Sequence, residues 1–254
     1  MQDKKPKILL AEDTKTSRDV IAEQLRLLGY ACDVACDGEE ALALWRKGDY
    51  ALLLTDCHMP RLDGFELTRL IREVETRENR CPVIAVTANA MQGEAEYCKE
   101  KGMDDYLPKP MLMKDLGAML AKWLQGEVVQ SGVETEVIIE DAAPLVWDAL
   151  ALTRMVGDNP TMHRRLLERF LIGAEAQTAQ IETAAGSGEC AIVAELAHKL
   201  KSGSRTVGAM ELGHLCQRIE WVGLAGDVAE CRIQAASLSV AFLRAAEKIN
   251  VSLV

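Results

Sequence analysis

Long apolar runs and basic clusters are both missing from this sequence. No run reaches the roughly 18 apolar residues that a transmembrane helix needs, and the N-terminal apolar run is too short for a signal peptide. No group of Lys and Arg is interrupted by aromatic residues, and a net charge of −10 argues against nucleic acid as the main partner. We therefore expect a cytoplasmic segment with no membrane contact and no direct nucleic-acid contact. If it belongs to a membrane receptor, we expect it to be a cytoplasmic part of that receptor.

CxxC pairs are also missing, although the chain has 8 cysteines. A structural zinc site normally needs such pairs, so the spacing argues against one. Most of the cysteines lie in apolar runs, where they are typical of small core residues. This usage fits a reducing compartment.

The first part of the sequence, residues 1–125, alternates short apolar runs with amphipathic helical stretches. This alternation predicts an α/β fold, a doubly wound five-stranded parallel sheet covered by helices on both faces. The predicted strands lie in residues 7–13, 31–36, 50–56, 82–88 and 105–110. The predicted helices lie near residues 15–28, 38–47, 64–77, 92–101 and 112–124.

Residues 126–143 contain five acids and no base. We interpret them as a mostly flexible acidic linker, in which "EVIIE" could form a surface strand. From residue 144 to 254 the periodicity is helical, and the short breaks between helices predict an antiparallel four-helix bundle. The predicted helices cover residues 145–156, 159–185, 189–203, 209–223 and 227–249.

Ligands of an open parallel sheet bind beyond the carboxyl ends of its strands, so the residues at those ends matter most. They are Glu12, Asp13, Asp56, Thr87 and Lys109. Three carboxylates that crowd together favour a hard cation such as Mg²⁺, and the hydroxyl and ammonium groups can bind an anion. The carboxylate at position 56 could accept a phosphoryl group as an acyl phosphate.

This constellation resembles the receiver domain of two-component response regulators over about residues 5–125. "ILLAEDTKTSRDVIAEQLRLLGY", "LLLTDCHMPRLDGFELTRLIR", "PVIAVTANA" and "GMDDYLPKP" stand in the order of the family's segments. The resemblance implies a flavodoxin-like fold with Asp56 as the phosphoryl acceptor. It also implies that Asp13, Asp56 and the backbone carbonyl of His58 bind Mg²⁺ or Mn²⁺, supported by Glu12.

The same resemblance assigns roles around the bound phosphoryl group. Thr87 and Lys109 would contact its oxygens, and Tyr106 would be the aromatic switch residue that follows Thr87. The Lys109–Pro110 peptide bond is expected to be cis.

An enzyme class with similar parts is the haloacid-dehalogenase-type phosphatases, which also phosphorylate an aspartate at a strand end. They need a second aspartate two residues after the nucleophile, where this sequence has His58. Cys57 is not expected to be a nucleophile, because alternation along the strand directs it to the face opposite Asp56.

One histidine of the second part lies in "AELAHKLKSGSRTVGA", residues 194–209. The apolar residues of this stretch recur at helical spacing, and His198 lies roughly opposite their stripe. We therefore expect it on an open face beside Lys201, Ser202 and other small residues. A neutral imidazole there could act as a nucleophile, and the lysine on the same face could attract phosphoryl oxygens.

The stretch resembles the family of histidine phosphotransfer (HPt) domains. His198, Leu200, Lys201, Gly208 and Ala209 match the family pattern, while Ser202 stands where glycine is commoner. A receiver followed by an HPt domain resembles the C-terminal part of unorthodox hybrid sensor histidine kinases. The resemblance implies a phosphorelay from a sensor histidine kinase to Asp56, to His198, and on to a downstream response regulator.

Two questions about activity stay open at this stage. No ATP-binding kinase domain precedes the receiver in this sequence, so we expect a phosphoryl carrier that does not use ATP itself, whether an excised kinase tail or a free-standing protein. Alternatively, the HPt part could be a phosphorylation-controlled docking module without relay chemistry.

Overall fold

The structure is a computed structural model, and it describes residues 6–76, 80–87, 94–124 and 144–253. Contacts divide the chain into two compact units, Met1–Thr135 and Glu136–Val254. The predicted linker, residues 126–143, lies outside the described residues.

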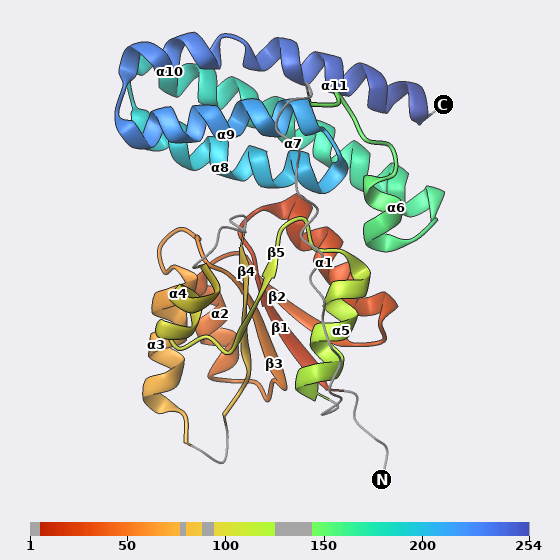
Figure 1. The fold of residues 1–254 in the computed structure, drawn as a ribbon, viewed down its shortest axis with the longest axis vertical. Coiled ribbons are helices and arrows are strands. Elements are labelled where there is room, and N and C mark those ends of the chain that lie inside the picture. The colour runs from red at the N-terminus through yellow and green to blue at the C-terminus, as the bar shows by residue number, and fades with distance from the viewer. Residues whose placement is uncertain (1–5, 77–79, 88–93, 125–143, 254) are drawn as a thin grey trace. The chain divides into compact units, whose positions relative to one another are not determined.

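The first unit contains a five-stranded sheet in which all neighbouring strands pair in parallel, in the order β2-β1-β3-β4-β5 (Figure 1). Its strands are β1 (Lys7–Ala11), β2 (Ala31–Ala35), β3 (Leu52–Asp56), β4 (Val83–Thr87) and β5 (Asp105–Pro108). β1, β3 and β4 are almost wholly buried, as expected where helices cover both faces of a parallel sheet. This topology confirms the predicted doubly wound α/β fold.

Helices cover both faces of the sheet (Figure 1). They are α1 (Lys15–Leu27), α2 (Gly38–Trp45), α3 (Gly64–Val74), α4 (Glu94–Glu100) and α5 (Met113–Leu124). α1 and α5 pack on one face, and α2, α3 and α4 pack on the other. The helices therefore leave the carboxyl ends of the strands as the edge where polar residues can gather.

Alternation along the strands divides the core of this unit in two. Leu9 and Leu53 pack under α2, α3 and α4, while Ile8 and Leu54 pack under α1 and α5. Cys57 is fully buried in the first of these cores, which confirms its predicted packing role. The two-residue period thus decides which helices each strand residue contacts.

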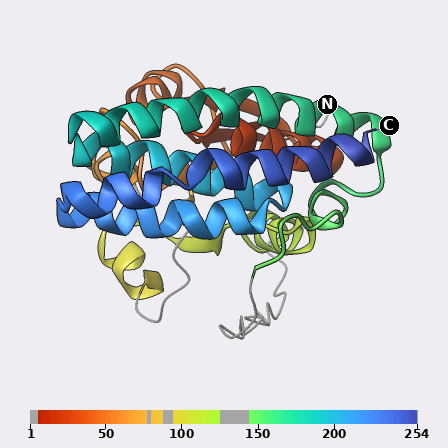
Figure 2. The ribbon, with the colours of Figure 1, turned by 90° about the horizontal axis from the view of Figure 1, so that it is seen from above.

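The second unit is helical, as predicted. Its helices are α6 (Ala151–Val156), α7 (Pro160–Ser187), α8 (Cys190–Val207), α9 (Met210–Ala225), α10 (Val228–Ala235) and α11 (Leu238–Ser252). α8 packs against α7 and α9, and α11 packs against the same two helices. Figure 2 shows α7 and α11 running side by side along the bundle.

The predicted single helix over residues 227–249 is two helices, α10 and α11, which meet at Ala236 and Ser237. The Glu182 carboxylate on α7 accepts hydrogen bonds from the backbone N–H of Ser239 at 3.2 Å and from its hydroxyl at 2.6 Å. A side chain distant in sequence thus satisfies a donor in the first turn of α11. Periodicity within 227–249 contains no sign of that partner.

The helix predicted over residues 145–156 begins only at Ala151. The preceding backbone pairs with the turn between α8 and α9 instead: Leu145 C=O accepts from Glu211 N–H at 2.9 Å, and Asp148 N–H donates to Gly208 C=O at 2.7 Å. α8 also continues four residues beyond its predicted end at residue 203, to Val207. Gly208 then ends it with a φ of 85°, in the left-handed region that favours glycine.

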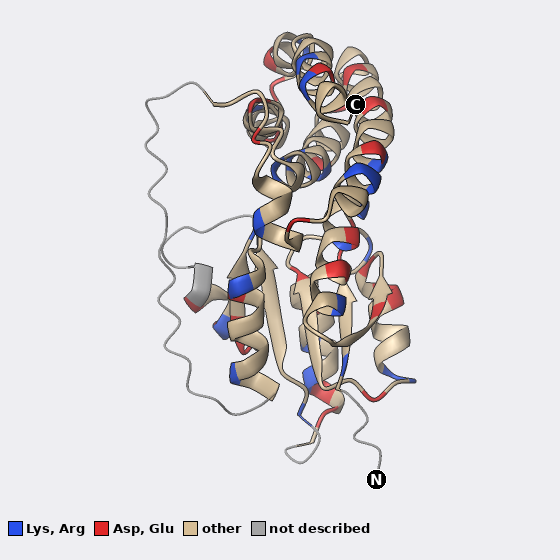
Figure 3. Ribbon diagram, turned by 90° about the vertical axis from the view of Figure 1, so that its right-hand side faces the viewer, with Lys and Arg blue, Asp and Glu red and all other residues tan. Residues whose placement is uncertain are grey.

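Charged residues of both signs are interspersed along the helices of both units (Figure 3). Among the described residues, no helix is both long enough and apolar enough to cross a membrane. All cysteines are free thiols. Cys36, just after β2, is exposed, whereas the others are buried or partly buried.

Candidate functional sites

The carboxyl ends of β1 and β3 bring three acids together. Glu12 and Asp13 follow β1 directly, and Asp56 is the last residue of the neighbouring strand β3. One carboxylate oxygen from each of the three lies within 4.8 Å of the others. Glu12 and Asp56 are only 0% and 3% exposed, so little water screens their mutual repulsion.

Lys109, which follows β5, is the cation of this cluster. Its Nζ lies 2.7 Å from Glu12 Oε2 and also donates to Asp56 Oδ2. Burial raises the pKa of Glu12 to about 7, and the negative charge of Asp56 adds to this rise while Lys109 opposes it. Burial acts to lower the pKa of Lys109, but the carboxylates of Asp56 and Glu12 outweigh it and raise that pKa.

Thr87 and Tyr106 are placed by the pairing of β4 with β5. Thr87 ends β4, is 2% exposed, and accepts the backbone N–H of Lys109 on its carbonyl at 2.7 Å. Tyr106 is partly buried and packs against the core under α2, α3 and α4. The Lys109–Pro110 bond is cis, as the family resemblance implied.

The loop between β3 and α3 begins at the acceptor candidate. His58 N–H donates to Asp56 Oδ1 at 3.1 Å, and Gly64 N–H donates to Cys57 C=O at 3.0 Å. A Cβ at Gly64 would lie 2.1 Å from the Asp56 carbonyl oxygen, so only glycine fits there. The side chain of His58 is exposed, which leaves its backbone as the part close to the acids.

The residues present fit a divalent cation. Hard cations such as Mg²⁺ take oxygen ligands, and three carboxylates offer them here within a short distance. Burial and the negative charge of Asp56 both raise the pKa of Glu12, so the ionised form of this carboxyl group is disfavoured here despite Lys109. A bound cation would stabilise the ionised carboxylates.

In the helical unit, His198 lies on α8 and is paired across the bundle. Its Nδ1 is 2.7 Å from Oε1 of Glu220, which lies on α9. Lys201 Nζ donates to the other oxygen, Oε2, of the same carboxylate. One glutamate thus orients the imidazole and neutralises the neighbouring ammonium group.

The surroundings of His198 are less open than expected. The side chain of His198 is 16% exposed. Lys201 is 6% exposed and Ser202 is 5% exposed. The predicted open face around His198 is therefore wrong for these two neighbours, which are buried. α8 packs against α9, and Glu220 on α9 contacts both His198 and Lys201.

Glu220 is a residue that sequence reasoning missed. It stands between Ile219 and Trp221, where an acid on an amphipathic helix is usually a solvated residue. Burial acts to raise its pKa, but the hydrogen bonds from His198 and Lys201 outweigh burial and lower it. Its distance of 22 residues from the histidine left no local signal for the pair.

The other two histidines of the helical unit, His163 and His214, lie in different environments from His198. His163 Nε2 contacts the Gly157 carbonyl at 2.8 Å, in the turn between α6 and α7. Burial lowers the pKa of His214, and the nearby charges of Arg205 and Arg218 lower it further.

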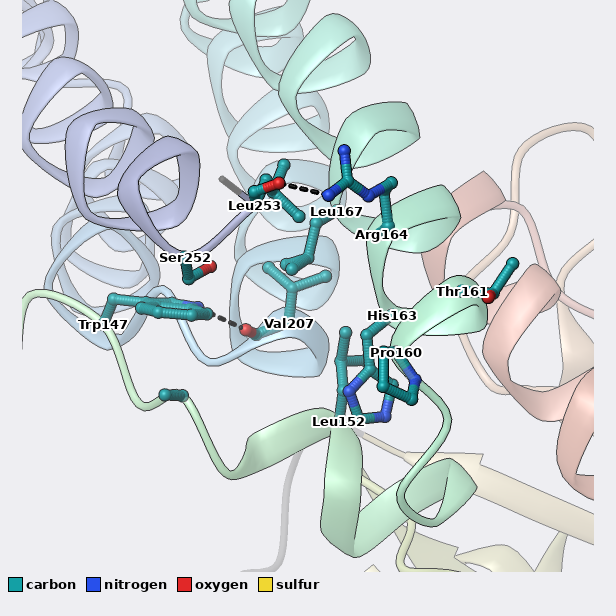
Figure 4. Close-up of a pocket in the computed structure, with 11 residues that line it drawn as sticks. Trp147, Leu152, Pro160, Thr161, His163, Arg164, Leu167, Val207, Ser252 and Leu253 are labelled. Carbon is teal, nitrogen blue, oxygen red and sulfur yellow. Dashed lines mark hydrogen bonds between the residues drawn. The ribbon is translucent and has the colours of Figure 1, made fainter.

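A cavity of about 500 Å³ lies at the end of the helical unit where α6, α7, α8 and α11 meet (Figure 4). Two of its polar side chains have partners within the cavity wall: Trp147 Nε1 donates to the Val207 carbonyl at 2.9 Å, and Arg164 donates to the Leu253 carbonyl. His198 does not line it. The cavity is therefore separate from the histidine–glutamate pair.

Comparison with known families matches both units. Residues 8–121 match the response regulator receiver domain, and residues 165–247 match the Hpt domain. The chain therefore belongs to the phosphorelay signal-transduction proteins, as a receiver domain followed by an Hpt domain.

Its relatives include two bacterial sensor proteins. It is 30% identical over 210 residues to the virulence sensor protein BvgS of Bordetella pertussis. This match covers 80% of this chain and 17% of BvgS. It is 30% identical over 221 residues to the aerobic respiration control sensor protein ArcB of Escherichia coli. This match covers 84% of this chain and 27% of ArcB. The chain thus spans about a sixth to a quarter of the length of these relatives.

Among solved structures, the receiver domain of the sensor histidine kinase PA1611 from Pseudomonas aeruginosa is 41% identical to this chain. The match covers 47% of this chain and 97% of that one, with a TM-score of 0.43. That receiver holds a magnesium ion coordinated in its active site cleft.

Proposed function

We propose that this chain carries a phosphoryl group from a histidine kinase to Asp56, from Asp56 to His198, and from His198 to an aspartate of a separate response regulator. The observation that supports this most directly is that one chain contains both an acidic site closed by Lys109 and a histidine held by Glu220. Either site alone would allow one transfer. The two together allow a relay.

In the first step, an Asp56 oxygen attacks the phosphorus of the kinase phosphohistidine. An O–P bond forms as the N–P bond breaks, and the charge that develops on the phosphoryl oxygens needs neutralising. The Lys109 ammonium and the Thr87 hydroxyl lie at the neighbouring strand ends for this role. Tyr106 would follow the position of Thr87.

Asp13, Asp56 and the carbonyl of His58 would hold a divalent cation, with Glu12 in support. We propose Mg²⁺ for this site, with Mn²⁺ as a substitute of similar ligand preference. When bound, the cation supplies charge neutralisation to the phosphoryl oxygens and to the crowded carboxylates.

In the second step, an imidazole nitrogen of His198 attacks the acyl phosphate, and the N–P bond forms as the O–P bond breaks. A carboxylate on Nδ1 favours the tautomer that carries its proton there, which places the nucleophilic lone pair on Nε2. We therefore assign Nε2 as the phosphoryl acceptor. Lys201, held by Glu220 beside the ring, would attract the phosphoryl oxygens.

We further propose that the chain acts in the cytoplasm as the C-terminal relay of a hybrid sensor kinase. Its match to BvgS and ArcB supports this place, and its free thiols fit a reducing compartment. Its partners would then be a kinase histidine upstream and a receiver domain downstream.

The test is to locate the phosphoryl group after adding acetyl phosphate with Mg²⁺, or a partner kinase with ATP. Acyl phosphates are labile to base and hydroxylamine, whereas phosphohistidine survives base and is labile to acid. The wild type is compared with Asp56→Asn and His198→Gln. A relay predicts base-stable label at His198 only when Asp56 is present.

Two results would contradict the relay. Label on Asp56 that never reaches His198, even with a fresh receiver partner, would favour a docking role for the Hpt domain. Rapid release of inorganic phosphate from Asp56 without transfer would instead favour a phosphatase.

A further inference from the structure

The loop between β3 and α3 contains a backbone conformation that calls for an explanation. Arg61 has a φ of 67°, and among the described residues it is the one non-glycine residue with a positive φ. Side chains with a Cβ rarely adopt this region, because it brings the Cβ close to the backbone. Contacts elsewhere must therefore hold Arg61 in place.

Those contacts lie at the start of α2. The Arg61 guanidinium pairs with the Asp37 carboxylate, and its Nε lies 3.7 Å from Glu39 Oε2. Asp37 is 2% exposed and is the N-cap of α2, where its Oδ1 accepts the Glu40 N–H at 2.8 Å. The ion pair therefore joins an exposed loop to a buried helix cap.

Backbone packing shows how closely the loop lies on α2. A Cβ at Gly38, the first residue of α2, would lie 2.2 Å from the Leu62 carbonyl oxygen. Gly64, two residues after Leu62, packs against the start of the loop, because a Cβ there would lie 2.1 Å from the Asp56 carbonyl oxygen. The segment between Asp56 and Gly64 is thus fixed at both ends, and the Arg61–Asp37 pair is its charged contact with α2.

We propose that Arg61 and Asp37 form a loop latch that positions the backbone of His58 for cation binding. This inference rests on the proposed function, because it assumes that the carboxylates and the His58 carbonyl bind Mg²⁺. Arg61 acts here as a positioning residue, since it reaches the cation site only through the loop backbone. Nothing in the latch requires Arg61 to touch the cation or the phosphoryl group.

The direction in which Mg²⁺ affinity changes on mutation distinguishes the latch from a purely electrostatic effect. Removing a positive charge near a cation site should strengthen Mg²⁺ binding, and removing a negative charge should weaken it. A latch predicts that both removals weaken binding, because either one releases the loop. Weaker Mg²⁺ binding after loss of the positive charge and also after loss of the negative charge would therefore identify a positioning role.

The experiment measures Mg²⁺ affinity of the full chain by isothermal titration calorimetry. Arg61→Gly removes the guanidinium, and glycine adopts a positive φ without strain. Asp37→Asn removes the charge but keeps a good helix cap. Arg61→Lys restores a cation, and Arg69→Ala is the matched control, because Arg69 forms similar exposed pairs with Glu66 and Glu73 on α3.

We expect Arg61→Gly and Asp37→Asn each to weaken Mg²⁺ binding by about threefold to tenfold, at or below the effect usual for groups that orient metal ligands. The double variant should be no weaker than either single variant, Arg61→Lys should recover most of the affinity, and Arg69→Ala should match the wild type. Thermal unfolding of the metal-free proteins checks that each variant is folded.

Tighter Mg²⁺ binding by Arg61→Gly, or affinity unchanged in both single variants, would overturn the latch and leave the cation site intact. If the wild type itself binds no Mg²⁺, the proposed cation site fails instead. The two failures are thus distinguishable within one set of titrations.

Discussion

Glu220 places one carboxylate between a ring nitrogen and an ammonium group. The imidazole of His198 gains a fixed orientation from this contact, and Lys201 gains a partner in a place that is 6% exposed. A buried ammonium without a carboxylate would be costly, so Glu220 makes the position of Lys201 possible. The histidine site is therefore a set of three residues, of which two can be recognised from the sequence.

Replacing Glu220 should slow transfer to the histidine. Glu220→Gln keeps an amide oxygen near Nδ1 but removes the charge, and we expect the transfer rate from Asp56 to His198 to fall about tenfold, the equivalent of one charge-assisted hydrogen bond. Single-turnover transfer from phosphorylated Asp56 measures this rate. Glu195→Gln is the control, because Glu195 pairs with Lys199 on the same helix face but is 57% exposed, and an equal loss there would contradict the role of Glu220.

The lowered pKa of Glu220 makes the helical unit sensitive to acid. A carboxyl group whose pKa is lower in the folded state contributes stability above its unfolded pKa, and this contribution is lost as the pH falls through the folded pKa. We expect the free energy of unfolding of the helical unit to fall as the pH drops below the ordinary glutamate pKa of 4.5, and to fall less steeply in Glu220→Gln. Denaturant unfolding at several pH values measures the two slopes, and equal slopes would show that Glu220 is not responsible.

Residues with a local motif could be predicted, and residues with a distant partner could not. The placing of Glu12, Asp13, Asp56 and Lys109 at one edge of the sheet followed from strand ends alone, and the structure brings them together. The partners of Asp37 and Glu220 lie 24 and 22 positions away in the sequence. Pairing across elements depends on packing angles, which hydrophobic periodicity does not contain.

At the scale of elements, the turn between α8 and α9 depends on a single glycine. Gly208 has a φ of 85°, and a Cβ there would lie 2.3 Å from the Asp148 carbonyl oxygen. A side chain at this position would therefore suffer both the strain of a left-handed backbone and a clash with the Asp148 carbonyl. The same turn also receives the backbone of the segment before α6.

Gly208→Ala should therefore lower the free energy of unfolding of the helical unit by about 2 kcal/mol or more. Gly226→Ala is the matched control, because Gly226 has a φ of 73° but nothing within 4 Å of its added Cβ. That variant should show the strain alone, about 1 kcal/mol. Urea unfolding followed by circular dichroism measures both values, and equal losses would exclude the clash.

Element boundaries were predictable where the chain itself ends a helix. Asn159 before Pro160 is a local signal, and the predicted start of α7 is within one residue of the observed one. Gly208 and Gly226 are local signals after α8 and α9, although the predicted ends at 203 and 223 fell short of Val207 and Ala225. The division between α10 and α11, and the late start of α6, depend on hydrogen bonds to other elements. Those bonds form only once the bundle is assembled.

At the scale of the whole molecule, two kinds of hydrophobic period predicted two architectures, and both are present. Each unit buries apolar residues of its own, and the candidate cation ligands all lie in the first unit. Stabilisation by a ligand should therefore be confined to the unit that binds it.

Mg²⁺ at about 100 times its dissociation constant should stabilise the receiver unit by about 2.7 kcal/mol. Hydrogen exchange followed by mass spectrometry should then show slower exchange in peptides from β1, β3 and β5, with unchanged exchange in peptides from α8 and α9. Asp13→Asn should remove the effect. Slower exchange throughout both units would show that they unfold as one.

The exposure of Cys36 makes the chain suited to site-selective chemical labelling. The other cysteines are buried or partly buried, so a maleimide dye under brief treatment would attach at this thiol before the rest. Cys36 follows Ala35, whose carbonyl accepts the Glu12 N–H at 3.1 Å, and precedes Asp37 of the loop latch. A fluorophore attached to this thiol would lie next in sequence to the partner of Glu12 and to the loop latch, with no engineered residue. We expect its emission to change when Asp56 is phosphorylated.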